Sequence, residues 1–121
     1  MFGWFRKKTP KPLEPESRWV VSRDGEIISV RDPEGAVTAI AIPDLSVVEA
    51  ETNDSGPWGI DFWWLLCGPG DQQPCAFPQG ATGETGIIEY LSALPGFDHR
   101  AMIDAMGSTA NRSFTLWRKP A

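Results

Sequence analysis

Few residues of this 121-residue chain have side chains that could bind a metal ion or carry out catalysis. The sequence holds one histidine, His99, and two cysteines, Cys67 and Cys75. A zinc site needs three or four ligands at workable spacing. His99 falls in the first turn of a predicted helix, where we expect a solvated side chain. The Gly-x-Ser-x-Gly pattern of many hydrolases is also absent. We therefore predict no catalytic residue, no metal site and no cofactor.

The stretch Gly80-Ala-Thr-Gly-Glu-Thr-Gly86 is rich in glycine and precedes a predicted helix, as phosphate-binding loops do. It lacks the lysine of such loops, and the carboxylate of Glu84 would repel a phosphate group. We predict that this stretch is a connector that begins the helix.

Cys67 and Cys75 form a second group that could do chemistry. With a loop centred on Asp71, they would lie roughly opposite each other on neighbouring strands, where a disulfide could act as a thiol switch. The alternative is that both are small apolar residues of the interior. The apolar part of the N-terminus, Met1 to Phe5, is too short for a secretion signal and precedes the charges. We therefore expect a cytoplasmic protein with reduced thiols.

Asp61 is the carboxylate in the most apolar part of the chain, residues 59–67. If its surroundings are covered, the carboxylate must accept hydrogen bonds or have a raised pKa. Hydrogen bonding would favour a structural role in the turn at residues 53–57, and a raised pKa would favour a catalytic acid. We prefer the structural role, so enzymatic activity is uncertain and less favoured than binding. The residues proposed for binding a partner are Asp54, Trp58, Asp61 and Trp63.

Residues 59–67 are predicted to be the central strand of the protein, because the run is short, aromatic and closed by turn residues at both ends. Alternation places Phe62, Trp64 and Leu66 on one face and Trp63, Leu65 and Cys67 on the other. Since both faces carry large apolar side chains, either protein covers both faces or one face is an exposed aromatic surface that binds a partner.

Turn signals divide the rest of the chain into short elements. Asp24-Gly25 predicts a type I′ hairpin across residues 19–30, with Val21 opposite Ile28 and an ion pair between Arg23 and Glu26 at its tip. Asp32-Pro-Glu-Gly35 predicts a second turn. Further strands are expected at 36–42, 45–52, around 75–77 and at 113–118. The strand around 75–77 is expected to lie at a sheet edge because of Pro74.

Two helices are predicted between the last two strands. The first spans residues 84–94, with Thr82 as its N-cap and Pro95-Gly96 as its stop. The second begins after Asp98 as N-cap, with Phe97 and Met102 as a hydrophobic staple, and ends at Gly107. In the last strand, Phe114 and Leu116 are expected to face away from Trp117.

This order predicts an α+β fold: a mostly antiparallel, curved sheet of about six strands plus a C-terminal strand, with two consecutive helices on one face. A partial barrel of the pleckstrin-homology type is the alternative, because a curled sheet would also cover both faces of the central strand. Residues 18–118 are predicted to form one globular domain.

Residues 1–17 are predicted to be a basic, aromatic and proline-rich tail. Residues 1–18 carry five basic and two acidic groups, for a net charge of +3, and the other 103 residues carry six basic and fourteen acidic groups, for −8. An acidic body argues against nucleic acid as a ligand. The tail could bind weakly to the inner surface of a membrane, through Phe2, Trp4, Phe5, Arg6, Lys7 and Lys8.

The segments Glu51–Pro57, Ile60–Trp64, Gly80–Glu84 and Leu94–Asp98, in this order, resemble those of a family of small bacterial proteins of uncharacterised function. The resemblance covers roughly residues 18–118. It implies a free-standing single domain, and no activity, ligand or catalytic residue follows from it.

Three functions are compatible with these observations. The first is a small non-catalytic binding or regulatory protein whose acidic, tryptophan-bearing surface meets a basic or apolar protein partner. The second is a peripheral membrane protein held by its N-terminal tail. The third is a small enzyme built on Asp61, or a thiol switch of Cys67 and Cys75. The sequence predicts neither a particular partner nor an oligomeric state.

Overall fold

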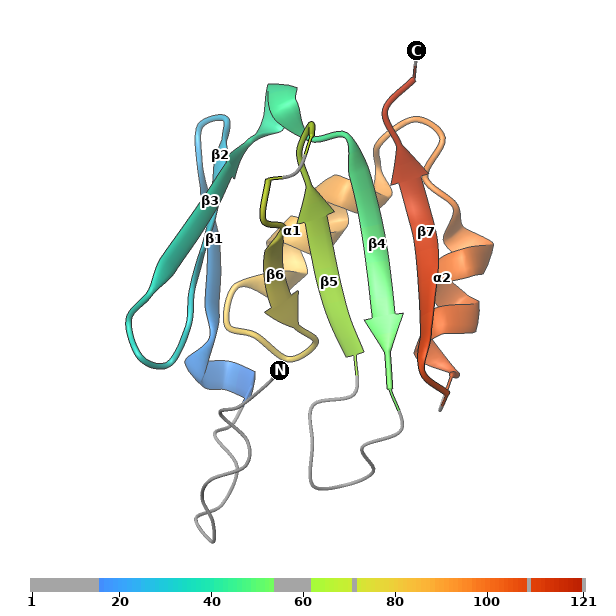
Figure 1. Cartoon of the computed structure of the whole chain (residues 1–121), viewed down its shortest axis with the longest axis horizontal. Coiled ribbons are helices and arrows are strands. Elements are labelled where there is room, and N and C mark those ends of the chain that lie inside the picture. Colours follow the sequence, from blue (N-terminus) through green and yellow to red (C-terminus); the bar gives the residue numbers. More distant parts are fainter. Residues whose placement is uncertain (1–15, 54–61, 71, 109, 121) are drawn as a thin grey trace, which may run out of the picture.

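The computed structural model describes residues 16–53, 62–70, 72–108 and 110–120, which form two antiparallel sheets and two helices (Figure 1). The first sheet has the order β1-β2-β3, and the second has the order β6-β5-β4-β7. The elements are η2 (Glu16–Arg18), β1 (Val20–Asp24), β2 (Ile27–Arg31), β3 (Val37–Ala41), η3 (Ile42–Asp44), β4 (Val47–Thr52), β5 (Phe62–Cys67), β6 (Cys75–Pro78), α1 (Glu84–Ser92), α2 (His99–Met106) and β7 (Arg112–Arg118).

The predicted α+β class is confirmed, with one change of arrangement. The strands divide into two open sheets instead of forming one curved sheet, and neither sheet closes into a barrel. This arrangement sets aside the pleckstrin-homology-like alternative. In the described part of the chain, neither helix is long and apolar enough to cross a membrane.

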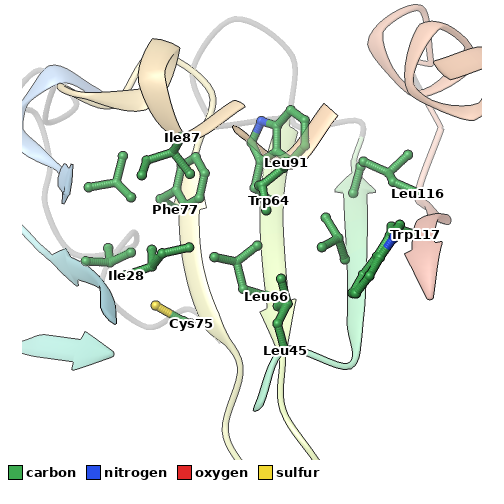
Figure 2. Packing of buried hydrophobic residues seen from close by; sticks show 14 of the residues in the cluster. Ile28, Leu45, Trp64, Leu66, Cys75, Phe77, Ile87, Leu91, Leu116 and Trp117 are labelled. Carbon is green, nitrogen blue, oxygen red and sulfur yellow. The ribbon is translucent and has the colours of Figure 1, made fainter. Parts of the chain in front are cut away.

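β5 lies in the middle of the second sheet, between β4 and β6 (Figure 1). Residues 62–67 are a strand as predicted, and residues 59–61 lie outside the described residues. Phe62, Trp64 and Leu66 join the hydrophobic core under the helices, where Trp64 and Leu66 are fully buried (Figure 2). The core also receives Ile87 and Leu91 from α1. The face of the second sheet that carries Trp63, Leu65 and Cys67 points away from the helices, and we call it the open face.

The first sheet lies across the edge strand β6. Ile28 and Ile40 from the first sheet share the core with Phe77 from β6. At the contact between the sheets, the hydroxyl of Thr38 donates to Sγ of Cys75 at 3.5 Å, and that thiol lies 3.7 Å from the carbonyl oxygen of Thr38. β6 is an edge strand, as Pro74 predicted, and the first sheet shields it from pairing with another chain.

The N-terminal hairpin turns one residue later than predicted. Its register pairs Val21 with Val30 and Arg23 with Ile28, so the two loop residues are Gly25 and Glu26. Gly25 has a φ of 64°, and no non-glycine residue in the described part of the chain has a positive φ, a pattern that fits a type II′ turn better than type I′. When the turn moves by one residue, the cross-strand partner of each residue moves by two. Val21, Ile28 and Val30 therefore still point inward, as predicted.

The predicted ion pair at the hairpin tip is wrong for the same reason. Arg23 is opposite Ile28 and not opposite Glu26. Its Nε donates to the carbonyl oxygen of Gly25 at 2.9 Å, and its guanidinium lies 4.4 Å from the centre of the Tyr90 ring. The following turn forms as predicted, because Oδ1 of Asp32 accepts hydrogen bonds from the amides of Glu34 and Ala36.

α1 begins without the predicted threonine cap. Its N-cap is Gly83, with a φ of 90°. Thr82 instead pairs with β1: its amide donates to Trp19, its carbonyl oxygen accepts from Val21 at 2.9 Å, and its hydroxyl donates to Ser17. Glu84 accepts a hydrogen bond from the amide of Gly80 at 2.9 Å, so the glycine-rich stretch is tied to the start of the helix.

α2 follows the predicted capping pattern. Oδ1 of Asp98 accepts a hydrogen bond from the amide of Ala101 at 2.9 Å, and Phe97 is buried next to the cap. Gly107 ends the helix as predicted. Its φ is −94°, so it does not adopt the left-handed conformation that favours glycine at the end of a helix.

β7 contains a bulge that the sequence pattern did not predict. Its register against β4 shifts between Val48 and Glu49, so that Trp117 is opposite Val48 and Phe114 is opposite Ala50. The extra residue lets Leu116 and Trp117 both be buried. Phe114 and Trp117 therefore share one face, and the prediction that they lie on opposite faces of the strand is wrong. The indole of Trp117 donates to the carbonyl oxygen of Pro95 at 2.9 Å.

Candidate functional site

The open face of the second sheet has an ordered chemical pattern. Strand register sets two rows of neighbouring side chains across it, each running from β7 through β4 and β5 to β6. In each row a hydroxyl is followed by a carboxylate and then by two apolar side chains. The rows are Ser113, Glu51, Trp63 and Pro78, and Thr115, Glu49, Leu65 and Ala76.

A groove of about 710 Å³ lies between this open face and the end of the first sheet. Trp19, which directly precedes β1, meets the open face: its ring contacts that of Trp63 edge to face, with centroids 5.1 Å apart. Trp63 is only 9% exposed and Leu65 is half-buried, so the groove has an apolar floor. Its lining is Trp19, Val30, Asp32, Ala36, Thr38, Glu51, Thr52, Asn53, Trp63, Leu65, Gln73, Pro74, Ala76, Asn111, Arg112 and Ser113.

The charged lining of the groove is mainly acidic. Glu51 is exposed on the sheet, and Asp32 comes from the turn between β2 and β3 on the opposite wall. Asp32 also has a structural role, since its Oδ1 holds that turn. Arg112 lines one end, but its guanidinium lies 4.7 Å from the centre of the Phe114 ring and is engaged there. The groove thus combines an apolar floor with a carboxylate on each wall.

Only part of the predicted binding set can be placed. Trp63 lines the groove. Asp54, Trp58 and Asp61 lie outside the described residues. The same holds for the predicted membrane contacts, Phe2, Trp4, Phe5, Arg6, Lys7 and Lys8.

Sequence reasoning missed Trp19, Glu51 and Leu65 as members of this site. A signal for Glu51 existed, because alternation from Val48 and Ala50 places Glu49 and Glu51 on the face that carries Val47. The position of Trp19 depends on how two separate sheets meet, and local periodicity contains no such information.

The two cysteines are free and face opposite sides of the second sheet. In the strand register, Cys75 is opposite Leu66, the residue that precedes Cys67. A shift of one residue reverses the face, so the predicted placement of the thiols opposite each other is wrong. Burial raises the pKa of the Cys67 thiol, and the carboxylates of Glu49 and Glu51 raise it further. Burial also raises the pKa of Cys75, against a smaller lowering by the hydrogen bond from Thr38.

These directions predict slow thiol chemistry in the native protein. Only the thiolate reacts, so a raised pKa means that a higher pH is needed for the same rate. We expect Cys67, which is half-buried, to react with 5,5′-dithiobis(2-nitrobenzoate) before the buried Cys75, and both to react far faster in urea. The variants Cys67→Ser and Cys75→Ser assign the two phases. A native intramolecular disulfide, or a Cys75 that reacts first, would contradict the placement of the thiols.

Within the described residues, no three His, Cys, Asp or Glu side chains gather closely enough to hold a metal ion. No family model, curated protein or solved structure matches the chain. The resemblance to a family of small bacterial proteins therefore stays a prediction, and the case for a function depends on the groove itself.

Proposed function

We propose that the protein is a small non-catalytic binding protein that holds a segment of a partner protein in the groove between its two sheets. The observation that carries this proposal is the apolar floor formed by Trp63 and Leu65 beside Glu51. Binding sites typically pair apolar and aromatic lining with a few polar groups that orient the ligand.

The geometry supports a binding role better than a structural one. A sheet face that only meets solvent is expected to carry polar side chains along each strand. On β5, the open face carries Trp63, Leu65 and Cys67 in succession. The first sheet covers Trp63 through Trp19, and Leu65 stays half-buried within the groove. A partner that covers Leu65 would gain about 25 cal/mol for each Å² of apolar surface removed from water.

The proposal is tested by selecting binders from a library of random nine-residue peptides displayed on phage. We expect selected peptides to shift the indole N–H resonances of Trp19 and Trp63 in the labelled full-length protein. Ser113→Arg, an exposed position beside Glu51, should weaken binding about tenfold or more by filling the groove. Val37→Arg, at an exposed position outside the groove lining, is the matched control and should bind normally.

Two results would overturn the proposal. In the first, no selected peptide perturbs either indole resonance. In the second, Ser113→Arg and Val37→Arg bind the selected peptides equally well, which would place the binding surface elsewhere. Thermal melting of each variant checks that the fold is retained, since both positions are exposed and a small effect on stability is expected.

A further inference from the structure

We propose that the groove and the adjoining open face select an extended, basic partner segment in which two Arg or Lys side chains stand two residues apart. One is for Glu51, which lines the groove, and the other is for Glu49, which lies beside the groove on the open face. This inference depends on the binding function proposed above and adds the chemical class and the spacing of the ligand. It uses the row pattern of the open face rather than the groove volume.

The first argument is spacing. Glu49 and Glu51 are two residues apart on β4, and their register partners Leu65 and Trp63 confirm that both point to the open face. Alternate residues of a strand are separated by roughly 6.7 Å. An extended peptide presents its own alternate side chains with the same separation, so one basic residue can meet each carboxylate when the two basic residues are at positions i and i+2 of the ligand.

The second argument is the apolar surface beside each carboxylate. Cross-strand neighbours have Cβ atoms about 4.5–5.5 Å apart, which places Trp63 beside Glu51 and Leu65 beside Glu49. Lys and Arg have long apolar stems with a charged end, and these stems pack along apolar surface while the charge stays near water.

The third argument is that the two carboxylates are available. Within the described residues, neither Glu49 nor Glu51 forms an ion pair. Their neighbours on β7 are the neutral hydroxyls of Thr115 and Ser113. The nearest basic residues in the register are Arg112 and Arg118. Arg112 is opposite Thr52, one residue from Glu51, and its guanidinium is engaged with the Phe114 ring. Arg118 is opposite Val47, two residues from Glu49, and is exposed.

Charge across the whole molecule favours the same ligand. The 103 residues that follow Arg18 carry six basic and fourteen acidic groups, for a net charge of −8. Long-range attraction speeds the encounter with a basic segment and disfavours acidic ones. Complementary charge and matched spacing therefore both indicate a basic extended segment of a protein.

The test compares three nine-residue peptides that differ only at the charged positions. One carries arginines two residues apart, one carries adjacent arginines, and one carries citrullines, which are neutral and nearly isosteric, two residues apart. Affinities are measured by calorimetry at 50 mM and 300 mM NaCl, and the indole resonances of Trp19 and Trp63 report occupancy of the groove. A neutral oligosaccharide, maltotriose, is titrated as a probe of a different chemical class.

We expect the peptide with spaced arginines to bind about tenfold more tightly than the citrulline peptide, and adjacent arginines to lose about two- to fivefold. Glu49→Gln and Glu51→Gln should each weaken the spaced-arginine peptide about two- to fivefold and leave the citrulline peptide unchanged. Glu89→Gln, an exposed position on α1, is the matched control. Higher salt should reduce these differences, because exposed charges are screened.

The outcomes separate the two proposals. If the citrulline peptide shifts the Trp63 indole with the same affinity, selection for basic residues is wrong and the groove remains a binding site. If adjacent and spaced arginines bind equally, the pairing with Glu49 and Glu51 is wrong. If no peptide shifts the indole resonances, or maltotriose alone does, both the basic segment and the proposed protein-binding function fail.

Discussion

Replacing Trp64 with alanine is expected to lower the free energy of unfolding by about 3–5 kcal/mol. Trp64 is fully buried in the middle of β5 (Figure 2). Its ring is stacked nearly parallel to that of Phe77, with centroids 6.1 Å apart, and is tilted against Phe62 at 5.8 Å. Removing it leaves a cavity between the sheet and α1 that rigid neighbours can fill only in part. Since domains are stable by only about 5–15 kcal/mol, this is a large fraction of the total.

Urea unfolding followed by far-ultraviolet circular dichroism measures this loss. Val37→Ala is the control, because Val37 is 60% exposed on the outer surface of the first sheet, and a change near 0.5 kcal/mol is expected there. A loss below about 1 kcal/mol for Trp64→Ala would show that β5 is not the centre of the core.

Trp64→Phe separates the volume of the ring from its polar atom. Within the described residues, the indole Nε1 of Trp64 is buried without a hydrogen-bond partner. A buried unsatisfied donor costs about 1–3 kcal/mol, and phenylalanine removes it. We therefore expect Trp64→Phe to lose much less stability than Trp64→Ala.

Replacing Gly83 with alanine is expected to cost at least about 2 kcal/mol. Gly83 has a φ of 90°, a region where a non-glycine residue costs about 1–3 kcal/mol. A Cβ atom there would also overlap the backbone carbonyl oxygen of Val21. That oxygen belongs to β1 and cannot move aside as a flexible side chain can, so either α1 or the first sheet must shift.

Gly86→Ala gives a matched control only three residues away. Gly86 lies within α1, and nothing lies within 4 Å of the position that its Cβ would take. Alanine is favoured over glycine inside a helix by about 0.5–1 kcal/mol, so this variant should be more stable than the parent chain. A clear loss of stability for Gly83→Ala together with a small gain for Gly86→Ala would support the close approach of α1 to β1. Equal stability of Gly83→Ala and the parent chain would contradict it.

The features that the sequence predicted correctly depend on local signals. The aromatic run at β5, the Asp98 cap and the Asp32 turn each require only residues within a few positions of one another. The edge position of β6 follows from the missing amide hydrogen of Pro74. The α+β class follows from the order of these elements along the chain.

The predictions that failed depend on contacts between distant segments. Thr82 has the side chain of a helix cap, but pairing with β1 occupies both its backbone and its hydroxyl. The bulge in β7 allows Trp117 to reach Pro95 while Leu116 stays buried, and no periodic pattern contains that choice.

The candidate site was only partly predictable for the same reason. Trp63 was found because a strand with two apolar faces is unusual, and alternation already pointed Glu51 to the same side as Val47. The groove itself requires the first sheet to stand beside the open face and bring Trp19 against Trp63. That arrangement depends on how the first sheet crosses β6, which is a property of the assembled fold.

The parallel bridge between Val20 and Thr82 constrains when this protein can fold during its synthesis. The ribosome adds about 5–20 residues per second, so roughly 3–12 s separate the synthesis of the two partners. During that interval, the inward side chains of the N-terminal hairpin lack α1, which packs against β1 in the folded protein. The closing of the first sheet onto the second is therefore expected only after Thr82 and α1 have been synthesised.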